Sequence, residues 1–307
     1  DHRLAVVVFQ VDLEPGFGRA VVITMTSDVA LLLENLGHRY LQLGPRITRN
    51  FAYFERLRDF KQKTGLIPDA YFSASKIEWL YTHCDEVKTA AKHNDLCFGT
   101  IDSWILFNLS QTNVFKTDTS NASRTMLVNL ETQDYDQELL DLFQINRSWL
   151  PDIHQSNALF DYSNKQITQT SLPIHAILGD QQAALFANCG NDPSKIKNTY
   201  GTGLFIASST GNKIIHTPKL LATIGWTINN ETTYALEGSI FVGGSAIQWC
   251  RDQLNLIRTA EESSSLAQEI SNNDHVYFVP ALTGLGAPHW DSSARGLFIG
   301  LTRGTTK

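Results

Sequence analysis

The chain has 307 residues, of which 42% are hydrophobic and 18% are charged, and its formal net charge is −6. The length suits two domains, and the composition permits a large core and excludes an intrinsically disordered chain. The acidic balance argues against a nucleic-acid partner, because phosphate backbones recruit basic protein surfaces.

The cysteines and the apolar runs predict the compartment. Cys84, Cys97, Cys189 and Cys250 form no CxxC pair, which argues against a zinc site. Scattered thiols in a chain of this size are typical of a reducing compartment. No apolar run has the length of a membrane-spanning helix, and no basic region with a cleavage site indicates secretion. We therefore expect a cytoplasmic protein without a membrane span.

The first predicted element is a β-hairpin. The apolar runs Leu4–Val11 and Ala20–Met25 are separated by Asp12 and a glycine-containing turn. Strand, turn and strand in this order are typical of a hairpin. Two interpretations remain open: an ordinary surface hairpin, or a phosphate-facing hairpin in which Asp12 lies near a metal ion.

Helical spacing of apolar residues then predicts amphipathic helices at Phe51–Lys63, Ala70–His83 and Asp136–Phe143. Ser73 or Ser75 is expected to cap the second of these helices. Tyr71, just before that helix, is either a core residue or the source of a hydroxyl group for a polyol substrate.

The segments between these helices are less regular. Phe98–Asn108 is interpreted as a turn followed by a buried helix with Trp104. Thr117–Met126 is rich in Ser, Thr and Asn, which predicts a loop whose side chains bond to the backbone. Pro151–Leu172 is polar and is predicted to be irregular.

A single acidic residue follows the next apolar segment. Ile174–Leu178 predicts a strand, Gly179 a turn, and Asp180 opens a predicted helix, Gln181–Ala187. Asp is favoured at helix N-caps, so Asp180 is interpreted either as a cap or as a ligand group at the carboxyl end of a strand.

We place a domain boundary in the polar linker Asn191–Lys197. Asn198–Ser208 then predicts strand, Gly-Thr-Gly turn and strand. Paired glycines allow backbone N–H groups to approach a phosphate, although most such turns are ordinary hairpins. Gly243-Gly244 opens a helix, Ser245–Leu256, and suits either an anion at the helix N-terminus or tight packing.

The other predicted elements of the second half are strands, at Leu220–Thr227, Thr233–Gly238, Asp274–Pro280 and Ala294–Leu301. A Gly-rich loop, Leu282–Trp290, separates the last two strands.

Eight stretches, in family order over about 240 residues, resemble the FGGY carbohydrate kinases. They are TGLIPDAYFSASKIEWL (Thr64–Leu80), FGTIDSW (Phe98–Trp104), NASRTML (Asn121–Leu127), GDQQAALF (Gly179–Phe186), KNTYGTG (Lys197–Gly203), ALEGS (Ala235–Ser239), AIQWCRD (Ala246–Asp252) and VPALTGLGAPHWDSSARG (Val279–Gly296). NASRTM and GLGAPHW resemble the glycerol kinase branch rather than the pentulose kinases.

The resemblance implies an α/β fold of two domains of the actin, hexokinase and heat-shock-ATPase (ribonuclease H-like) type, both incomplete here. Residues 1–190 would form the polyol-binding domain, with the first 60 or so residues degenerate or shortened. Residues 191–307 would begin the nucleotide-binding domain, truncated after Lys307.

The resemblance also implies roles on the substrate side. Asp180 is similar to the base that accepts the proton of the polyol hydroxyl group. Gln181, Tyr71 and Phe205 are similar to residues that contact glycerol, two through polar groups and one through its ring.

On the nucleotide side, Gly201 and Thr202 are similar to the family's second phosphate hairpin. Gly244 and Gln248 are similar to nucleotide contacts on the following helix. The cofactors implied are ATP and Mg²⁺, the partners are glycerol and further copies of the chain, and the reaction gives sn-glycerol 3-phosphate in glycerol catabolism.

Several departures from the family pattern accompany these matches. Asp12 and Arg19 stand where the first phosphate hairpin begins and ends, and Asp12 is a candidate metal ligand. The turn between them contains Glu14, whose charge repels phosphate, and Pro15, which lacks an N–H. The family's Asn-Gln-Arg-Glu-Thr segment and its pocket Trp have no counterpart.

Three interpretations therefore remain open. The chain is an incomplete glycerol kinase with impaired or retained activity, a catalytically inactive remnant or fragment, or an FGGY kinase for another polyol or a pentulose.

Overall fold

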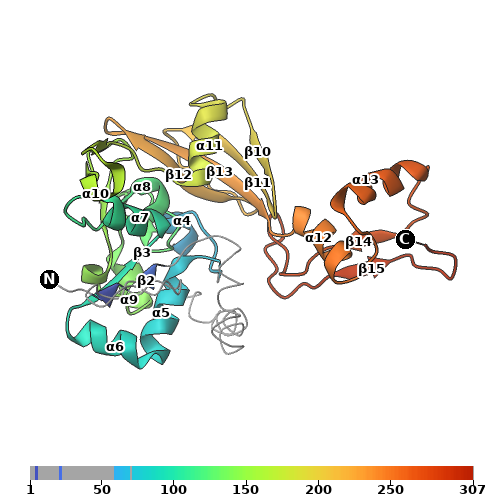
Figure 1. Ribbon diagram of the computed structural model, residues 1–307, viewed down its shortest axis with the longest axis horizontal. Helices are drawn as coiled ribbons and strands as arrows, with labels where there is room; N and C mark the ends of the chain where they lie inside the picture. The colour runs from blue at the N-terminus through green and yellow to red at the C-terminus, as the bar shows by residue number, and fades with distance from the viewer. Residues whose placement is uncertain (1–3, 6–20, 23–58, 70, 307) are drawn as a thin grey trace.

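The computed structural model describes residues 4–5, 21–22, 59–69 and 71–306, and its fold is mixed α/β (Figure 1). Among these residues, no helix is both long and apolar enough to cross a membrane. The elements of the first part are β1 (Leu4–Ala5), β2 (Val21–Val22), α4 (Phe60–Thr64), α5 (Ser73–His83), α6 (Asp85–Lys92), β3 (Leu96–Gly99), α7 (Ile101–Leu109), β4 (Lys116–Asp118), α8 (Thr119–Ala122), β5 (Val128–Asn129), β6 (Asp134–Tyr135), α9 (Gln137–Leu142), η1 (Arg147–Trp149), β7 (Asp152–His154), β8 (Asp161–Tyr162), α10 (Lys165–Thr168) and β9 (Pro173–Ile174).

A short parallel sheet lies at the centre of this first part. β3 pairs with β1 on one side and with β2 on the other, and both pairings are parallel. The predicted hairpin of Leu4–Val11 and Ala20–Met25 is therefore wrong for its described residues, because parallel strands cannot be joined by a tight turn. Apolar side chains from α5, α6, β3 and α9 form the core beside this sheet, among them Phe72, Phe98 and Leu139.

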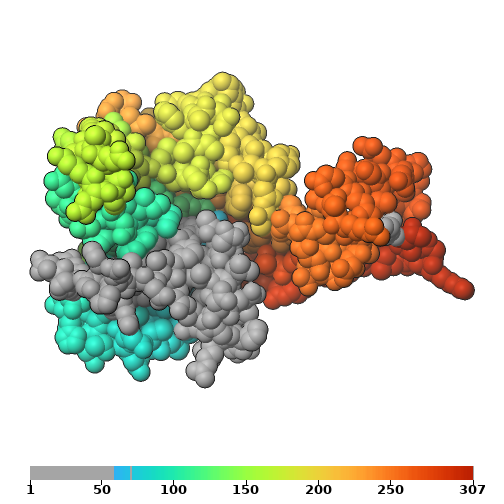
Figure 2. All heavy atoms as spheres, in the orientation of Figure 1, coloured from blue at the N-terminus to red at the C-terminus, as the bar shows by residue number. Residues whose placement is uncertain are grey.

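The second part begins with α11 (Asp180–Cys189) and a four-stranded antiparallel sheet. The sheet has the order β10-β11-β13-β12 and consists of β10 (Lys197–Tyr200), β11 (Leu204–Gly211), β12 (Leu221–Ile228) and β13 (Glu231–Ile240). α11 lies across this sheet (Figure 1). The last elements are α12 (Gly244–Asp252), α13 (Ala260–Glu269), β14 (Tyr277–Val279) and β15 (Leu297–Ile299). They form a lobe at one end of the molecule (Figure 2).

β12 attaches the antiparallel sheet to the first part. Leu221 belongs to the first core, and Ile224 packs with Leu130. The Ala222 N–H donates to the Gly65 carbonyl at 2.9 Å. Gly65 has a φ of +71°, and a Cβ atom there would lie 2.2 Å from the Ala222 carbonyl oxygen. Only glycine permits both this conformation and this approach. Gly65 therefore ends α4 and at the same time allows β12 to pack against the end of this helix.

Several predicted elements are confirmed. The helix at Asp136–Phe143 is α9, with Asp136 as its N-cap. The hairpin around the Gly-Thr-Gly turn is the antiparallel pair β10–β11. The strand predictions for the rest of this sheet agree with β12 and β13 within a few residues.

Other predictions were wrong. α5 is a helix, but its N-cap is Phe72, and neither Ser73 nor Ser75 caps it. Thr117–Met126 contains the end of β4 and the buried helix α8 rather than a loop, because its hydroxyl groups bond to the backbone of the segment and to threonines of β12. The strand predicted at Ile174–Leu178 is regular only at Pro173–Ile174.

Asp102 of α7 links this helix to β4. Its Oδ2 atom accepts a hydrogen bond from Thr117 Oγ1 at 2.6 Å. Its Oδ1 atom is buried and has no hydrogen-bond partner among the described residues. Burial raises the pKa of Asp102 to about 6, so the folded protein holds this proton more tightly than the unfolded chain does.

We expect the Asp102 carboxyl to make stability depend on pH. The folded pKa lies above the unfolded value, so the contribution is fully favourable below about pH 4 and is lost as the pH rises to about 6. The free energy of unfolding should fall by up to about 3 kcal/mol across that window. Asp102→Asn should remove this dependence in urea unfolding from pH 4 to 7, while Asp141→Asn, at an exposed carboxyl, should keep it. An unchanged slope in Asp102→Asn would contradict the assignment.

Candidate functional site

Asp180 lies at the first position of α11 and is exposed. Of the two interpretations of Asp180, the N-cap is wrong, because Gly179 occupies the cap position of α11. The Gly179 N–H donates to Ser120 Oγ at 2.9 Å, which joins the start of α11 to α8. Asp180 accepts hydrogen bonds from Gln181, through the backbone N–H at 2.7 Å and the amide Nε2 at 3.4 Å. The Asp180 carboxylate is therefore not used to cap α11, and its exposure makes it accessible to a ligand.

Two buried charges lie on the sheet face beneath α11. Lys197 of β10 pairs with Ala207 of β11, which pairs in turn with Glu237 of β13. Directly paired residues point to the same face, and Ala207 packs with Leu185 and Cys189 of α11. Lys197 and Glu237 therefore lie on the face that α11 covers, on either side of a small side chain.

Lys197 connects this face to α11. Its Nζ atom donates a hydrogen bond to Gln181 Oε1, and Thr199 Oγ1 approaches the same oxygen at 3.4 Å. Burial lowers the pKa of Lys197, while Glu237 and Asp180 act in the opposite direction. The Gln181 amide therefore lies between a buried ammonium group and the Asp180 carboxylate.

Glu237 is paired with Arg124, which follows α8. Arg124 Nη2 and Glu237 Oε1 are 2.7 Å apart, and the exposed fractions of the two side chains are only 9% and 4%. Ser239 Oγ donates to the same Glu237 oxygen at 2.8 Å, and the guanidinium carbon lies 5.4 Å from the centroid of the Phe72 ring. Arg124 Nη1 is buried without a hydrogen-bond partner in the described part of the chain.

Tyr71 reaches this cluster from the first part. Asp69 Oδ1 accepts a hydrogen bond from the Tyr71 N–H at 2.7 Å, and Lys76 Nζ donates to its carbonyl at 2.9 Å. These two bonds hold the backbone of Tyr71 from both sides. Its ring lies 5.7 Å from the ring of Phe241, measured between centroids.

The charges around Tyr71 show what its phenol faces. Burial raises the pKa of Tyr71 to about 12; Arg124 acts in the opposite direction, and Glu237 and Asp180 add to the rise. The phenol is therefore neutral at physiological pH and keeps its proton as a hydrogen-bond donor. Tyr71 and Asp180, predicted from distant stretches of sequence, lie within electrostatic reach of each other.

Phe205 occupies the same sheet face. It pairs with Ser239 of β13 and stands two residues before Ala207 in β11, so strand alternation places it on the face that α11 covers. The predicted substrate residues thus gather around the start of α11.

The Gly-Thr-Gly turn, Gly201–Gly203, lies at the other end of β10 and contacts α12. The N–H groups of Gly244 and Gly243 donate to the carbonyls of Gly201 and Thr202, each at 2.8 Å. Ser245 Oγ donates to the Thr202 carbonyl at 2.9 Å. The first N–H groups of α12 are therefore bonded to the turn and not directed at an open anion site.

Gly244 is required by this packing, since a Cβ atom there would lie 2.8 Å from the Gly201 carbonyl oxygen. Thr202 is exposed, and its N–H and hydroxyl groups bond to no other described residue. Gln248 is exposed one turn further along α12. The structure thus brings Gly201, Thr202 and Gly244 together and leaves Thr202 free to bind.

Two predicted residues, Asp12 and Arg19, lie outside the described residues. Within the described residues, no group of three or more His, Cys, Asp or Glu side chains could hold a metal ion. The metal assignment of Asp12 stays a prediction.

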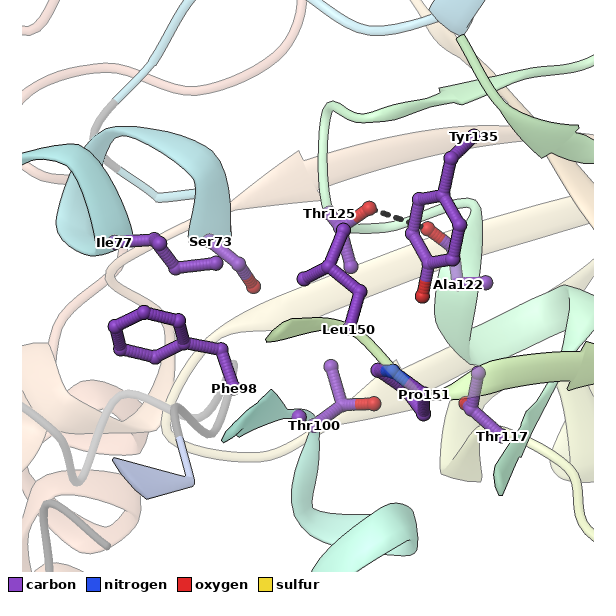
Figure 3. Close-up of a pocket in the computed structure, with 11 residues that line it drawn as sticks. Ser73, Ile77, Phe98, Thr100, Thr117, Ala122, Thr125, Tyr135, Leu150 and Pro151 are labelled. Atoms are coloured by element: carbon purple, nitrogen blue, oxygen red, sulfur yellow. Dashed lines mark hydrogen bonds between the residues drawn. The ribbon is translucent and has the colours of Figure 1, made fainter. Parts of the chain in front are cut away.

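A pocket in the first part lies apart from this site. It is lined by Ser73, Ile77, Phe98, Gly99, Thr100, Thr117, Ala122, Thr125, Tyr135, Leu150 and Pro151 (Figure 3). Ser73 Oγ points into it and has no partner among the described residues. None of the described residues predicted for catalysis, substrate or nucleotide lines this pocket.

Reasoning from the sequence missed three residues of the site, Lys197, Arg124 and Glu237. Their charges are buried, which a single sequence does not display. All three stand in stretches that resemble the family, NASRTML, KNTYGTG and ALEGS, but no role was assigned to them from this resemblance. A second signal was Glu237 after Ala235 and Leu236 in a predicted strand, where an unpaired buried charge would be costly.

Comparison with known proteins gives a consistent assignment. The model of the N-terminal domain of the FGGY family of carbohydrate kinases matches residues 47–187, and that of the C-terminal domain matches residues 196–307. The glycerol kinase of Dichelobacter nodosus is 50% identical over 265 residues, which are 84% of this chain and 53% of that protein. The glycerol kinase of Aquifex aeolicus is 49% identical over 242 residues, 79% of this chain and 49% of that protein. The chain spans about half the length of these relatives.

Solved structures agree with this result. The crystal structure of Plasmodium falciparum glycerol kinase with ADP has a TM-score of 0.71 and 35% identity, and the similarity covers 85% of this chain and 53% of that one. The gluconate kinase of Lactobacillus acidophilus has a TM-score of 0.67 and 25% identity, with the same coverage.

The Arg124–Glu237 pair gives a stability prediction. Arg124→Met or Glu237→Gln leaves one buried charge without its partner, so each should lower the free energy of unfolding by about 3 kcal/mol or more. The double variant should lose clearly less than the sum, because neither charge remains. Urea unfolding measures all three.

The control for this cycle is Asp85→Asn, which breaks the exposed pair Asp85–Lys88 and should cost less than about 1 kcal/mol. Additive losses for Arg124→Met and Glu237→Gln would show that the pair does not act as a unit.

Proposed function

The chain belongs to the FGGY family of carbohydrate kinases, and we propose that it is part of a kinase that transfers the γ-phosphoryl group of ATP to glycerol. The product is sn-glycerol 3-phosphate. One observation supports this most directly: Asp180 and Gln181 open α11 beside the buried charges of the sheet, and the charge of Asp180 acts on the Tyr71 phenol. The identity of 49–50% to two glycerol kinases supports the choice of polyol.

Asp180 is proposed as the base. Its carboxylate is exposed, and among the described residues only the backbone N–H and the side-chain amide of Gln181 donate hydrogen bonds to it. A lone pair can therefore accept the proton of a glycerol hydroxyl. Phosphoryl transfer needs little covalent chemistry from the protein, and orientation with charge stabilisation dominates. The proton moves from the attacking oxygen to a carboxylate oxygen of Asp180 as the attacking oxygen bonds to the γ-phosphorus, and the bond between that phosphorus and the bridging oxygen of ADP breaks, so that ADP leaves.

Three residues are proposed to orient glycerol. The neutral Tyr71 phenol donates a hydrogen bond, Gln181 offers an amide, and the ring of Phe205 covers the carbon chain. Phe205 lies on the sheet face under α11, Gln181 accepts a hydrogen bond from Lys197 of that face, and the charges of Asp180 and Glu237 act on the Tyr71 phenol. These groups fix which hydroxyl meets Asp180.

The residues of the Gly-Thr-Gly turn fit a phosphate in one respect, because the N–H and hydroxyl groups of Thr202 are exposed and have no described partner. Gly201, Thr202, Gly244 and Gln248 are proposed as nucleotide contacts, with Asp12 and Arg19 as further candidates. Bound ATP with Mg²⁺ supplies the phosphoryl group. Mg²⁺ in such sites is held largely by phosphates and water, so a cluster of three protein ligands is not required.

We also propose residues 1–190 as the polyol-binding domain and 191–307 as the start of the nucleotide-binding domain. A cytoplasmic location is proposed because all four cysteines are free thiols, as expected in a reducing compartment. We further propose that copies of the chain associate into a homo-oligomer.

Asp180→Asn tests the function. In a coupled assay for glycerol 3-phosphate with Mg-ATP, the substitution should reduce turnover by at least about 100-fold, because an amide cannot accept the proton. Asp192→Asn, at an exposed carboxylate on the following linker, should leave turnover unchanged. Equal turnover of Asp180→Asn and the unaltered chain would rule out the base.

Calorimetry separates the alternatives. Mg-dependent binding of ATP together with glycerol supports the kinase, and binding of neither supports an inactive remnant. Turnover of gluconate or a pentulose in preference to glycerol would reassign the substrate within the family.

A further inference from the structure

The hydrogen bond between Lys197 and Gln181 points to a residue that orients the proposed substrate site without touching the reacting atoms. Lys197 is 94% buried, its side chain ends at Gln181 Oε1, and it lies on the sheet face under α11. A lysine is rarely buried to this degree unless a specific partner compensates for its lost hydration.

The chemistry of the ammonium group decides the orientation of the amide. A protonated lysine has three donors and no acceptor, so only the oxygen of the Gln181 amide can face it. The amide nitrogen must then point the other way, and its distance of 3.4 Å to Asp180 Oδ2 agrees with this. With a neutral lysine amine, which has a lone pair, the reversed amide would be equally acceptable.

The neighbouring charges leave Lys197 available for this task. Glu237 faces Lys197 across Ala207, but Arg124 and Ser239 already bond to its carboxylate. From α11, Asp180 and the Cys189 thiol face Lys197. Burial lowers the pKa of Lys197 and these three groups oppose the change.

We propose that Lys197 is a positioning residue, whose ammonium group locks the Gln181 amide with its nitrogen toward Asp180 and toward the substrate hydroxyl groups. The inference deepens the proposed function and rests on it for the identity of the substrate. The lock itself is a property of the free protein and can be measured without any substrate.

The first measurement is NMR of the Gln181 side-chain amide in a chain labelled with ¹⁵N-glutamine, assigned by its loss in Gln181→Glu. The locked amide should give a pair of resonances shifted from those of a free glutamine. Lys197→Met should move them to the free position, and Lys197→Arg, which also only donates, should retain them. Lys195→Met, at an exposed lysine two residues earlier, is the matched control and should change nothing.

A pH titration of the unaltered chain gives the same test without a variant that could misfold. As the pH rises, deprotonation of Lys197 should move the Gln181 resonances to the free position, at a pH below the ordinary pKa of lysine. Lys197→Arg should abolish this transition. Resonances that do not change with pH, or in Lys197→Met, would overturn the proposal. A transition that disappears in Cys189→Ala would assign it to the thiol and would overturn it equally.

Glycerol binding by calorimetry provides the functional readout. Lys197→Met should weaken binding about tenfold, because the released Gln181 amide no longer holds the orientation in which it bonds to glycerol, a loss of about one hydrogen bond, and Lys197→Arg should restore the affinity. Failure of the unaltered chain to bind glycerol while its Gln181 amide is locked would refute the proposed function and leave the lock intact. Unchanged affinity in Lys197→Met would refute the positioning role.

Discussion

The buried ion pair between Arg124 and Glu237 is the contact on which the site depends. It joins the end of α8 to β13, so a residue of the first part is fixed against the antiparallel sheet of the second. Two charges removed from water need accurate geometry, because their mutual attraction only just compensates for their lost hydration. The pair therefore favours one relative position of the two parts, in which the charges of Glu237 and Asp180 act on the Tyr71 phenol.

The hairpin β10–β11 connects the two ends of the proposed site. Its first residues, Lys197 and Thr199, bond to Gln181 on the substrate side, and its turn bonds to the start of α12 on the nucleotide side. Thr199 and Thr202 are three residues apart, so the chain between them spans at most about 10 Å. Gln181, beside the proposed base Asp180, and the Gly-Thr-Gly turn are thus both bonded to one short hairpin.

Elements with a strong local pattern were predicted correctly. α9, α11 and the strands β10 to β13 follow from apolar periodicity and from the glycine and asparagine positions between them. Predictions from weaker local patterns were wrong where tertiary contacts determine the structure. The hydroxyl-rich segment Thr117–Met126 is buried because Ser123 and Thr119 bond to threonines of β12, and a loop and a buried helix of this composition have the same sequence pattern.

The sequence by itself determined the family resemblance, the helix that begins at Asp180 and the Gly-Thr-Gly hairpin, since each depends on neighbours in the chain. Only the tertiary structure decided that Asp180 is not a helix cap, that Lys197 faces Gln181, and that Arg124 pairs with Glu237. The physical reason is that a buried charge is stable only beside its partner, and these partners are 16 and 113 residues apart in the sequence. Such a pairing follows from the register of strands and the position of α11, which local patterns do not specify.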